Sequence, residues 1–216
     1  MDFATVKRGE VLRYMGCKGE VPPEVLNLAE ECLAMLGEVC EPRYVVREFP
    51  LKMPGDGVIE TDCFRTVSRN LEKNLKDCHK LLVFAATLGI GVDHLIRRYN
   101  RLDMSRTVAL QAGAAAVLEE YCDQVCRKLR EYYERHRFYL RPRFSPGYGD
   151  FPLDCQPQIL HGLEAGKRVG ITLTEGFLMM PTKSVTAVMG VGKTPVRCRV
   201  GGCEVCGKRD CAYRRG

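Results

Sequence analysis

The chain has 216 residues, of which 45% are hydrophobic and 28% charged, with a formal net charge of +6. These proportions are typical of a soluble globular domain and exclude a disordered or collagen-like chain. The N-terminus lacks the apolar run of a signal peptide, and no run of about eighteen uncharged apolar residues occurs, so we expect a cytosolic protein without a membrane partner.

The first part of the chain predicts a helix followed by a strand. Apolar residues recur with helical spacing from Val25 to Leu36, and the preceding Pro22 and Pro23 are tolerated in a first turn. The segment RYVVREFPL, residues 43–51, is typical of a strand.

The next part predicts a second helix and a buried strand. Thr61 and Asp62 are good N-cap residues for a helix that would carry its apolar side chains on one face, namely Phe64, Val67, Leu71 and Leu75. The run KLLVFAATLG, residues 80–89, is continuously apolar over a strand's length.

The longest helical pattern runs from about Ser105 to His136, and its alanine-rich centre is almost free of charge up to Glu119. Such a centre must be buried. Three strands are expected after it, over FYLRPRF, VGITLTE and SVTAVMG, with a short helix over PQILHGLEAG. Because strands and helices do not alternate one for one, the sequence predicts an α+β fold, with a largely antiparallel twisted sheet packed against helices including this long one.

The octet AVMGVGKT, residues 187–194, is similar to a phosphate-binding P-loop. That motif needs a strand, a glycine-rich turn and then a helix that begins at the lysine, whereas Pro195 and a glycine-containing segment follow here. We therefore interpret the octet as a strand ending in a turn. A nucleotide-hydrolysing enzyme would have to bind ATP or GTP through Lys193, and we expect no such binding.

The loop RFSPGYGDFPLDCQ, residues 143–156, concentrates residues suited to ligand contacts. Pro146 and Gly147 favour a tight turn in which main-chain groups can approach a ligand closely. Arg143 can bind a carboxylate, and Tyr148 can cover an apolar or aromatic ligand group. An ordinary surface turn is an equally good interpretation of these residues alone.

Twelve cysteines are more than packing requires, and in a reducing compartment they indicate thiols or metal ligands rather than disulfides. Eight are scattered and are expected to be structural. The other four form a C-x4-C-x2-C-x4-C pattern in the last nineteen residues, at Cys198, Cys203, Cys206 and Cys211.

The four clustered cysteines predict a metal or cluster site. Four thiolates suit tetrahedral zinc, although zinc pairs usually have a longer insert between them. The first three spacings equal those of plant-type ferredoxins, which favours an iron-sulfur cluster slightly. The sequence therefore predicts a domain over residues 1–196 and a Cys-rich tail over residues 197–216. The four histidines have no metal-pair spacing, and nucleic acid is not an expected partner, because no RNA- or DNA-binding signature is present.

RFSPGYGDFPL, followed by LTEGFLMMPTKSVTAVMG, resembles the signature of the activation (reactivation) domain of cobalamin-dependent methionine synthase. The likeness is greater to the free-standing activation proteins of anaerobic bacteria. It extends upstream through AATLGIGVD and the alanine-rich helix ending VLEE, so it covers most of residues 10–192. The resemblance implies an S-adenosylmethionine site and a role in rescuing oxidised cob(II)alamin by reductive methylation.

The resemblance also implies which residues hold the ligand. The family's R-x-x-x-G-Y loop corresponds to Arg143, Ser145, Gly147 and Tyr148. A family glutamate on the long helix corresponds best to Glu119, beside the adjacent Glu120. An ammonium, a sulfonium and a carboxylate on one ligand require both acidic and basic partners, which this set supplies.

The resulting hypothesis is an activation protein that serves a methyltransferase system and docks onto the cobalamin-binding domain of a separate methionine synthase or related corrinoid protein. An electron donor is a further expected partner, and the cobalamin comes with the corrinoid protein. The alternative is a metal- or iron-sulfur-containing interaction or electron-transfer module without a working methyl-donor site. The Cys-rich tail fits both hypotheses, whereas the residues of the R-x-x-x-G-Y loop matter only to the first.

Overall fold

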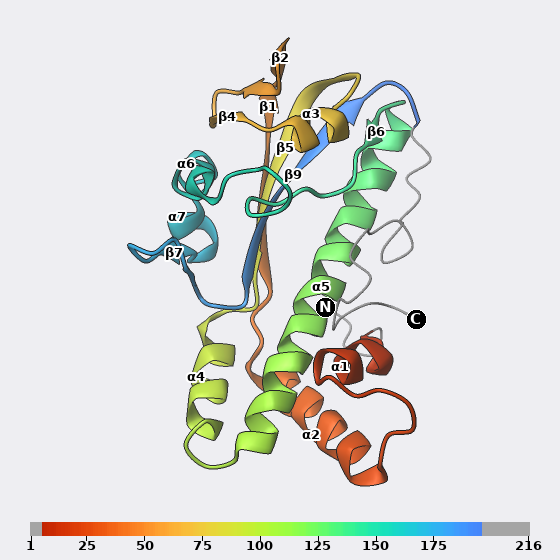
Figure 1. Ribbon diagram of the computed structural model, residues 1–216, viewed down its shortest axis with the longest axis vertical. Helices are drawn as coiled ribbons and strands as arrows, with labels where there is room; N and C mark the ends of the chain where they lie inside the picture. The colour runs from red at the N-terminus through yellow and green to blue at the C-terminus, as the bar shows by residue number, and fades with distance from the viewer. Residues whose placement is uncertain (1–5, 196–216) are drawn as a thin grey trace.

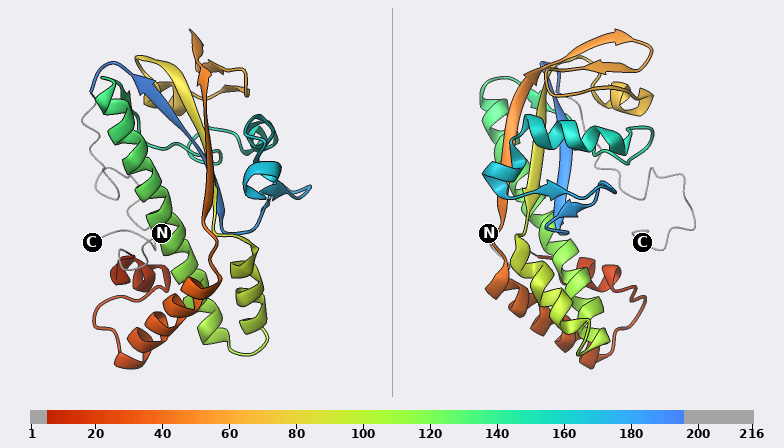
Figure 2. Two further views of the ribbon diagram at one scale, coloured as in Figure 1. Left: turned by 180° about the vertical axis from the view of Figure 1, so that it is seen from behind. Right: turned by 90° about the vertical axis from the view of Figure 1, so that its left-hand side faces the viewer.

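The computed structural model of the protein describes residues 6–195. The Cys-rich tail, with its predicted ligands Cys198, Cys203, Cys206 and Cys211, lies outside these described residues. The described chain forms a central antiparallel sheet with a long helix on one face and smaller elements on the other (Figures 1 and 2). The predicted α+β fold with an antiparallel sheet and one long helix is confirmed.

The central sheet has four strands in the order β1-β5-β9-β6, and every neighbouring pair is antiparallel. The strands are β1 (Arg43–Pro50), β5 (Cys78–Thr87), β9 (Ser184–Gly192) and the two-residue β6 (Tyr139–Leu140). The inner strands β5 and β9 are buried almost throughout, as their continuous apolar sequences predict. The sheet therefore requires cover on both faces.

Four helices build the core on one side of the sheet: α1 (Arg8–Tyr14), α2 (Pro23–Val39), α4 (Ile90–Tyr99) and α5 (Met104–Arg135). Helix α5 runs along the sheet, and the others gather around its first half (Figure 1). The alanine-rich centre of α5 is buried as expected, and α2 lies so close that a Cβ at Gly113 would come within 3.0 Å of Leu36 Cδ1. Among the described residues, no helix has the length and apolar character required to cross a bilayer.

Smaller elements cover the other face and build a second core with it. Helices α6 and α7 lie in front of the sheet and α5 behind it when the molecule is seen from the side (Figure 2, right). The helices are α3 (Arg69–Asn74), α6 (Gln156–Gly162) and α7 (Ala165–Val169), with a 3-10 turn at Leu153–Cys155. The strands are β2 (Lys52–Gly55), β3 (Val58–Glu60) and β4 (Arg65–Val67) in one small sheet, and β7 (Thr172–Leu173) and β8 (Met179–Met180) in another.

The predicted helix that begins at Thr61–Asp62 is wrong. The Thr61 hydroxyl accepts hydrogen bonds from the main-chain N–H groups of Cys63 and Phe64, and this local turn connects β3 to β4. The helix begins later, at α3, where Ser68 is the N-cap and its hydroxyl accepts from Leu71 N–H at 3.0 Å. Apolar residues do recur with helical spacing here, but the first of them precede α3, and Val67 lies in strand β4.

Three other elements differ from expectation in length. The strands predicted over FYLRPRF and VGITLTE shrink to the two-residue β6 and β7, and the predicted helix over PQILHGLEAG divides into α6 and α7. The division occurs at Glu164, which has a left-handed backbone (φ 53°). Helices α1 and α4 and the hairpin β2–β3 were not predicted.

The P-loop-like octet lies almost entirely inside β9, which runs straight through Gly190 to Gly192. Its glycines allow neighbouring residues to pack closely against the strand. A Cβ at Gly190 would lie 2.6 Å from Cys78 Sγ, and one at Gly192 would lie 2.9 Å from the Arg141 guanidinium. No phosphate-binding turn or helix start exists here among the described residues, in agreement with the strand interpretation.

Candidate functional site

The candidate site lies where one edge of β9 loses its partner strand. Strand β6 pairs only with Val191 and Gly192, and the chain beyond β6 makes one further bridge, between Phe144 and Val188. The first residues of β9, 184–187, therefore have no strand on this edge, although β5 pairs with them on the other. The loop 143–156 crosses this opening and closes it into a cavity.

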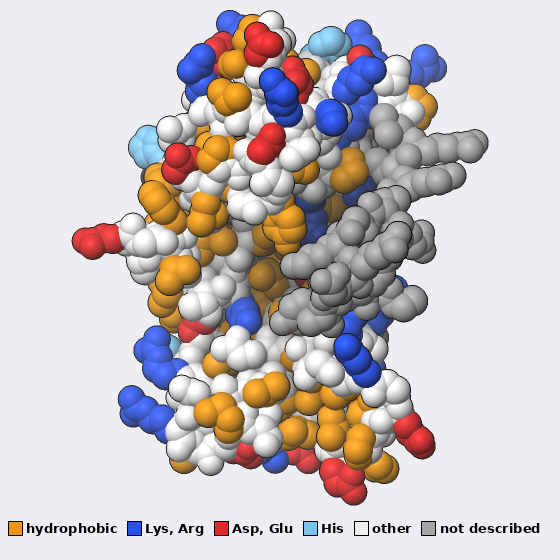
Figure 3. Space-filling model, viewed as in Figure 1, with side chains coloured by type: hydrophobic (Ala, Val, Ile, Leu, Met, Phe, Trp, Pro, Cys, Tyr) orange, Lys and Arg blue, Asp and Glu red, His pale blue; other side chains and the backbone are white. Residues whose placement is uncertain are grey.

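The cavity has a volume of about 440 Å³, which suits a small organic ligand. Its polar lining residues are Glu119, Arg143, Ser145, Gln156 and Thr186. Its apolar and aromatic lining residues are Phe144, Pro146, Tyr148, Leu153, Met179 and Val185. On the face shown in Figure 3, apolar side chains are frequent in the middle and again in the lower part, and charged side chains are most frequent at the upper end and along the lower margin.

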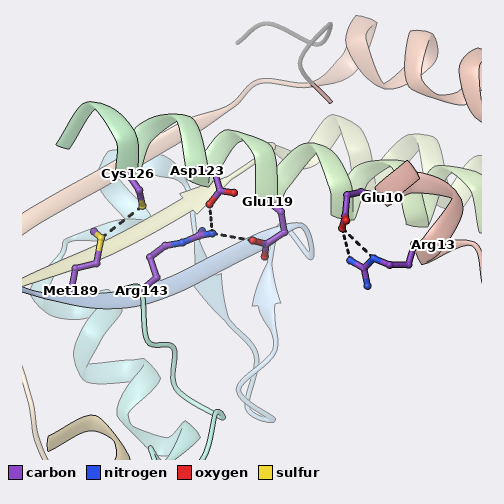
Figure 4. A network of polar contacts seen from close by, with 7 residues as sticks. All are labelled: Glu10, Arg13, Glu119, Asp123, Cys126, Arg143 and Met189. Carbon is purple, nitrogen blue, oxygen red and sulfur yellow. Dashed lines mark hydrogen bonds and ion pairs between the residues drawn. The ribbon is translucent and has the colours of Figure 1, made fainter. Parts of the chain in front are cut away.

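Arg143 is the central charged residue of the cavity. Its guanidinium lies beneath α5, between two carboxylates that point down from the helix (Figure 4). Its Nη2 donates to Glu119 Oε2 at 3.0 Å and to Asp123 Oδ1 at 2.8 Å. The two acidic residues are one helical turn apart and so share one face of α5. Both bonds use Nη2, so the guanidinium keeps further donors for a ligand carboxylate.

Burial and nearby charges act in opposite directions on the pKa of Arg143. Burial alone lowers the pKa, but Cys122, Cys126, Glu119 and Asp123 raise it, and the net result is a pKa above the ordinary value. Burial raises the pKa of the adjacent Cys122 thiol to about 12. The cysteine is therefore a neutral packing residue, and the guanidinium is a permanent cation.

The loop 143–156 is held in place from both sides. The Asp150 carboxylate accepts from the Arg69 N–H at 2.8 Å and from the Ser68 hydroxyl, at the start of α3. Gly147, with φ 89°, donates its N–H to Phe151 O at 2.8 Å, which makes the tight turn. The Phe151 ring is buried against the rings of Phe64 and Phe144. These contacts hold the loop in its observed shape.

Thr186 and Gln156 form a polar pair on the other side of β9. Side chains alternate along a strand, so Thr186 faces the same side as Val188, away from α5. Its hydroxyl donates to Gln156 Oε1 at 2.6 Å, and the two residues are only 2% and 4% exposed. The cavity thus straddles the strand edge, with charged groups toward α5 and neutral polar groups toward α6.

Four of the five residues expected at the ligand site line this one cavity: Arg143, Ser145, Tyr148 and Glu119. Tyr148 is 70% exposed. Gly147 does not line the cavity, and its contribution is the shape of the loop. Glu120, the adjacent alternative to Glu119, instead lines a smaller neighbouring cavity and accepts a hydrogen bond from Gln124.

The sequence reasoning missed the polar lining residues Gln156 and Thr186. It also missed Asp123, which accepts a hydrogen bond from Arg143 but lines the neighbouring cavity. Asp123 had a usable signal, because it lies one helical turn after Glu119. Thr186 is a polar residue in an otherwise apolar strand, which is a weaker signal. Met179 both packs into the core and lines the cavity.

Within residues 6–195 no group of three or more His, Cys, Asp or Glu side chains is arranged to hold a metal ion. All four histidines are exposed, at positions 79, 94, 136 and 161. Of the eight scattered cysteines, five are buried and three are half-buried, and all are free thiols. The predicted tail ligands lie outside the described residues.

The fold and cavity define an antiparallel α+β domain with a ligand-sized cavity of mixed charged, polar and apolar lining at the open edge of β9. A family model for the activation domain of vitamin B12 dependent methionine synthase matches residues 67–216, and the chain belongs to this family. The fold is similar to the crystal structure of the MetH reactivation domain bound to AdoHcy, with a TM-score of 0.67 and 20% identity over 91% of this chain and 78% of that one. No curated protein sequence matches the chain.

Proposed function

We propose that the cavity binds S-adenosylmethionine and that the protein supports reductive methylation of cob(II)alamin on a separate methionine synthase or related corrinoid protein. The single observation that carries the proposal is the pair of Arg143 and Glu119, joined at 3.0 Å, in the lining of a ligand-sized cavity. Membership of the activation-domain family also supports the proposal. The AdoHcy in the similar crystal structure is a product-like relative of the proposed ligand.

The charges of the cavity match those of the proposed ligand. Arg143 and Glu119 line the cavity, and Asp123 accepts from the same guanidinium from the neighbouring cavity, so the three groups together carry a net charge of −1. S-Adenosylmethionine carries an ammonium, a sulfonium and a carboxylate, with a net charge of +1. We infer that the ligand carboxylate binds Arg143 and that a cationic group lies near Glu119. In the partly buried site these contacts are stronger than in water.

The reaction that the protein would support has two steps. One electron from a separate donor reduces cob(II)alamin to cob(I)alamin on the corrinoid protein. The cobalt then attacks the S-methyl carbon, the C–S bond breaks, and methylcobalamin and S-adenosylhomocysteine form. The chain's own residues hold the methyl donor and orient its sulfonium toward the partner, so the contribution is proximity and orientation rather than acid–base catalysis.

The exposed side of the cavity is where the corrinoid protein has to approach. Tyr148, with 70% of its surface exposed, lies at the cavity and is placed to contact the ligand, the partner or both. We infer that the cobalamin-binding domain docks over this opening, because a methyl group can pass directly only between atoms in contact.

A reactivation assay tests the proposed function. A corrinoid protein in the cob(II)alamin state is mixed with an electron donor, S-adenosylmethionine carrying a labelled methyl group, and this protein, and formation of labelled methylcobalamin is followed by absorbance and radioactivity. We expect methylcobalamin only with the protein present, and much less with the Arg143→Ala variant. Equal methylation with and without the protein would contradict the proposal.

The Cys-rich tail supports a second candidate function, in which the chain is a metal- or iron-sulfur-containing interaction or electron-transfer module. Four cysteines in a C-x4-C-x2-C-x4-C pattern supply a complete set of thiolate ligands. We propose that the tail binds an iron-sulfur cluster or zinc. Metal and sulfide analysis of anaerobically purified protein, with a Cys203→Ser/Cys206→Ser variant as the control, decides between the two metals, and a metal-free wild-type protein would refute both.

A further inference from the structure

The end of the cavity away from α5 carries polar groups but no charge. Gln156 and Thr186 are almost completely buried there, and the Thr186 hydroxyl fixes the amide by donating to its Oε1 at 2.6 Å. Buried amides are normally hydrogen-bonded through both ends because an unpaired polar group inside a protein is costly. In this structure only the oxygen end of the amide is paired.

The amide nitrogen of Gln156 has no hydrogen-bond partner in the described part of the chain. It is not sealed inside the protein either, since Asn74 Oδ1 is the one side-chain polar atom among the described residues that is both fully buried and unpaired. Gln156 lines the cavity, so a ligand there can reach an amide whose two N–H groups are unpaired. A ligand that fills this end must supply an acceptor to them.

The main chain of Thr186 adds a donor and an acceptor at the same place. Val188 exchanges both of its main-chain hydrogen bonds with Phe144, at 2.9 and 2.8 Å, on the outer edge of β9. In an antiparallel strand every second residue points its N–H and C=O to the same edge, so those of Thr186 point to that edge too, beyond the last bridge. This end of the cavity therefore offers neutral donors and an acceptor.

Apolar side chains line the same cavity, among them Phe144, Leu153 and Met179. A flat, neutral group with polar atoms at its rim fits such walls, whereas a charged group would lose hydration without a counter-charge. The ligand's amino-acid end already has its counter-charges at Arg143 and Glu119, toward α5. The remaining part of an S-adenosyl ligand with the required chemistry is the purine base.

We propose that Gln156, oriented by the Thr186 hydroxyl, is a specificity-determining residue whose amide N–H donates to a ring nitrogen of the adenine. This inference rests on the proposed function, because it assigns the base end of the same ligand. Thr186 is a positioning residue, since its hydroxyl acts through Gln156 and holds the amide with its donors toward the cavity.

The test measures binding affinities by calorimetry while both the ligand and the protein are altered, so that the effects of the two changes can be compared. S-Adenosylhomocysteine and its 1-deaza, 3-deaza and 7-deaza analogues are titrated into the wild-type protein and into Gln156→Leu. We expect one analogue to bind the wild type about tenfold more weakly than the parent ligand, which is about 1.4 kcal/mol. In Gln156→Leu the parent should be weakened by the same factor, and that analogue should then lose nothing further.

Matched variants at position 186 test the positioning role. Thr186→Val keeps the side-chain shape and removes the hydroxyl, so it should reduce the discrimination among the analogues, whereas Thr186→Ser should restore it. Equal discrimination in wild type and Gln156→Leu would overturn the inference while leaving the proposed function intact. Absence of any S-adenosylhomocysteine binding to the folded wild type would instead contradict the proposed function itself.

Discussion

Along one edge of strand β9, the two halves of the strand have different neighbours. Beyond Val188 the edge is closed by β6 and by Arg141, whose guanidinium donates at 3.0 Å to the main-chain oxygens of Lys76 and Thr194. Before Val188 the edge opens into the cavity. The difference shows how a binding site arises in this fold: the partner strand stops early, and edge groups that would otherwise pair within the sheet become available to a ligand.

The largest expected effect concerns the closed half. Gly190→Val should lower the free energy of unfolding by about 3 kcal/mol, because even a Cβ would lie 2.6 Å from Cys78 Sγ and 2.8 Å from Leu75 Cδ2. Urea unfolding followed by circular dichroism measures the change. Gly176→Ala is the control, since a Cβ at Gly176 meets nothing within 4 Å. Wild-type stability in Gly190→Val would show that this half is not tightly packed.

The open half is sensitive in binding rather than in stability. Arg143→Ala should weaken S-adenosylhomocysteine binding by roughly 30-fold, about 2 kcal/mol, because a charge-assisted hydrogen bond to the ligand carboxylate is lost. Calorimetry gives the affinity. Arg47→Ala removes an arginine that contacts Gly162 O outside the cavity and should bind like the wild type. Equal affinities of the wild type, Arg143→Ala and Arg47→Ala would show that Arg143 does not contact the ligand.

Substitutions at the adjacent residues Glu119 and Glu120 can be compared directly in their effect on ligand affinity. Glu119→Gln should weaken S-adenosylmethionine binding about tenfold, or about 1.4 kcal/mol, because the carboxylate faces the ligand's cationic groups. Glu120→Gln alters the neighbouring cavity and should change the affinity less than twofold. If the two variants exchanged these behaviours, the acidic contact would belong to Glu120.

The smallest effect concerns the attachment of the loop. Hydrogen bonds from Ser68 and from the main chain of Asn70 and Arg69 hold the pKa of Asp150 below its ordinary value of 3.8. A lowered carboxyl pKa stabilises the fold above pH 3.8, and the contribution is lost as the pH falls through the folded-state pKa. Asp150→Asn should therefore lower the Tm at pH 7 but not in strong acid. Asp154→Asn, at another exposed aspartate, is the control, and a Tm difference for Asp150→Asn that persisted in strong acid would contradict the cause given.

Long, uniform segments of the fold were predictable from the sequence. The apolar run of β5 and the alanine-rich centre of α5 each specify one element with one environment, and the structure contains both. The segment 61–75 was not predictable in the same way. Its apolar spacing suits a helix, but the hydrogen bonds of Thr61 and the distant Asp150 decide where α3 begins.

Some residues of the candidate site were predictable from the sequence and others were not. Arg143, Ser145 and Tyr148 lie close together in one loop, so a local motif indicates them. Gln156 and Thr186 are 30 residues apart, and they meet only because β9 passes α6 at an open edge. No spacing rule connects them, since their contact depends on the sheet order and on how far β6 extends.

Calorimetric titration of the wild-type protein with S-adenosylmethionine and S-adenosylhomocysteine, with ATP as the parallel control, tests most directly whether the open edge of β9 is a ligand site. We expect saturable binding of both S-adenosyl ligands with one site per chain, weakened in Arg143→Ala and in Gln156→Leu, and no binding of ATP. Binding that neither variant weakens, or no binding of either S-adenosyl ligand to the folded protein, would contradict this expectation.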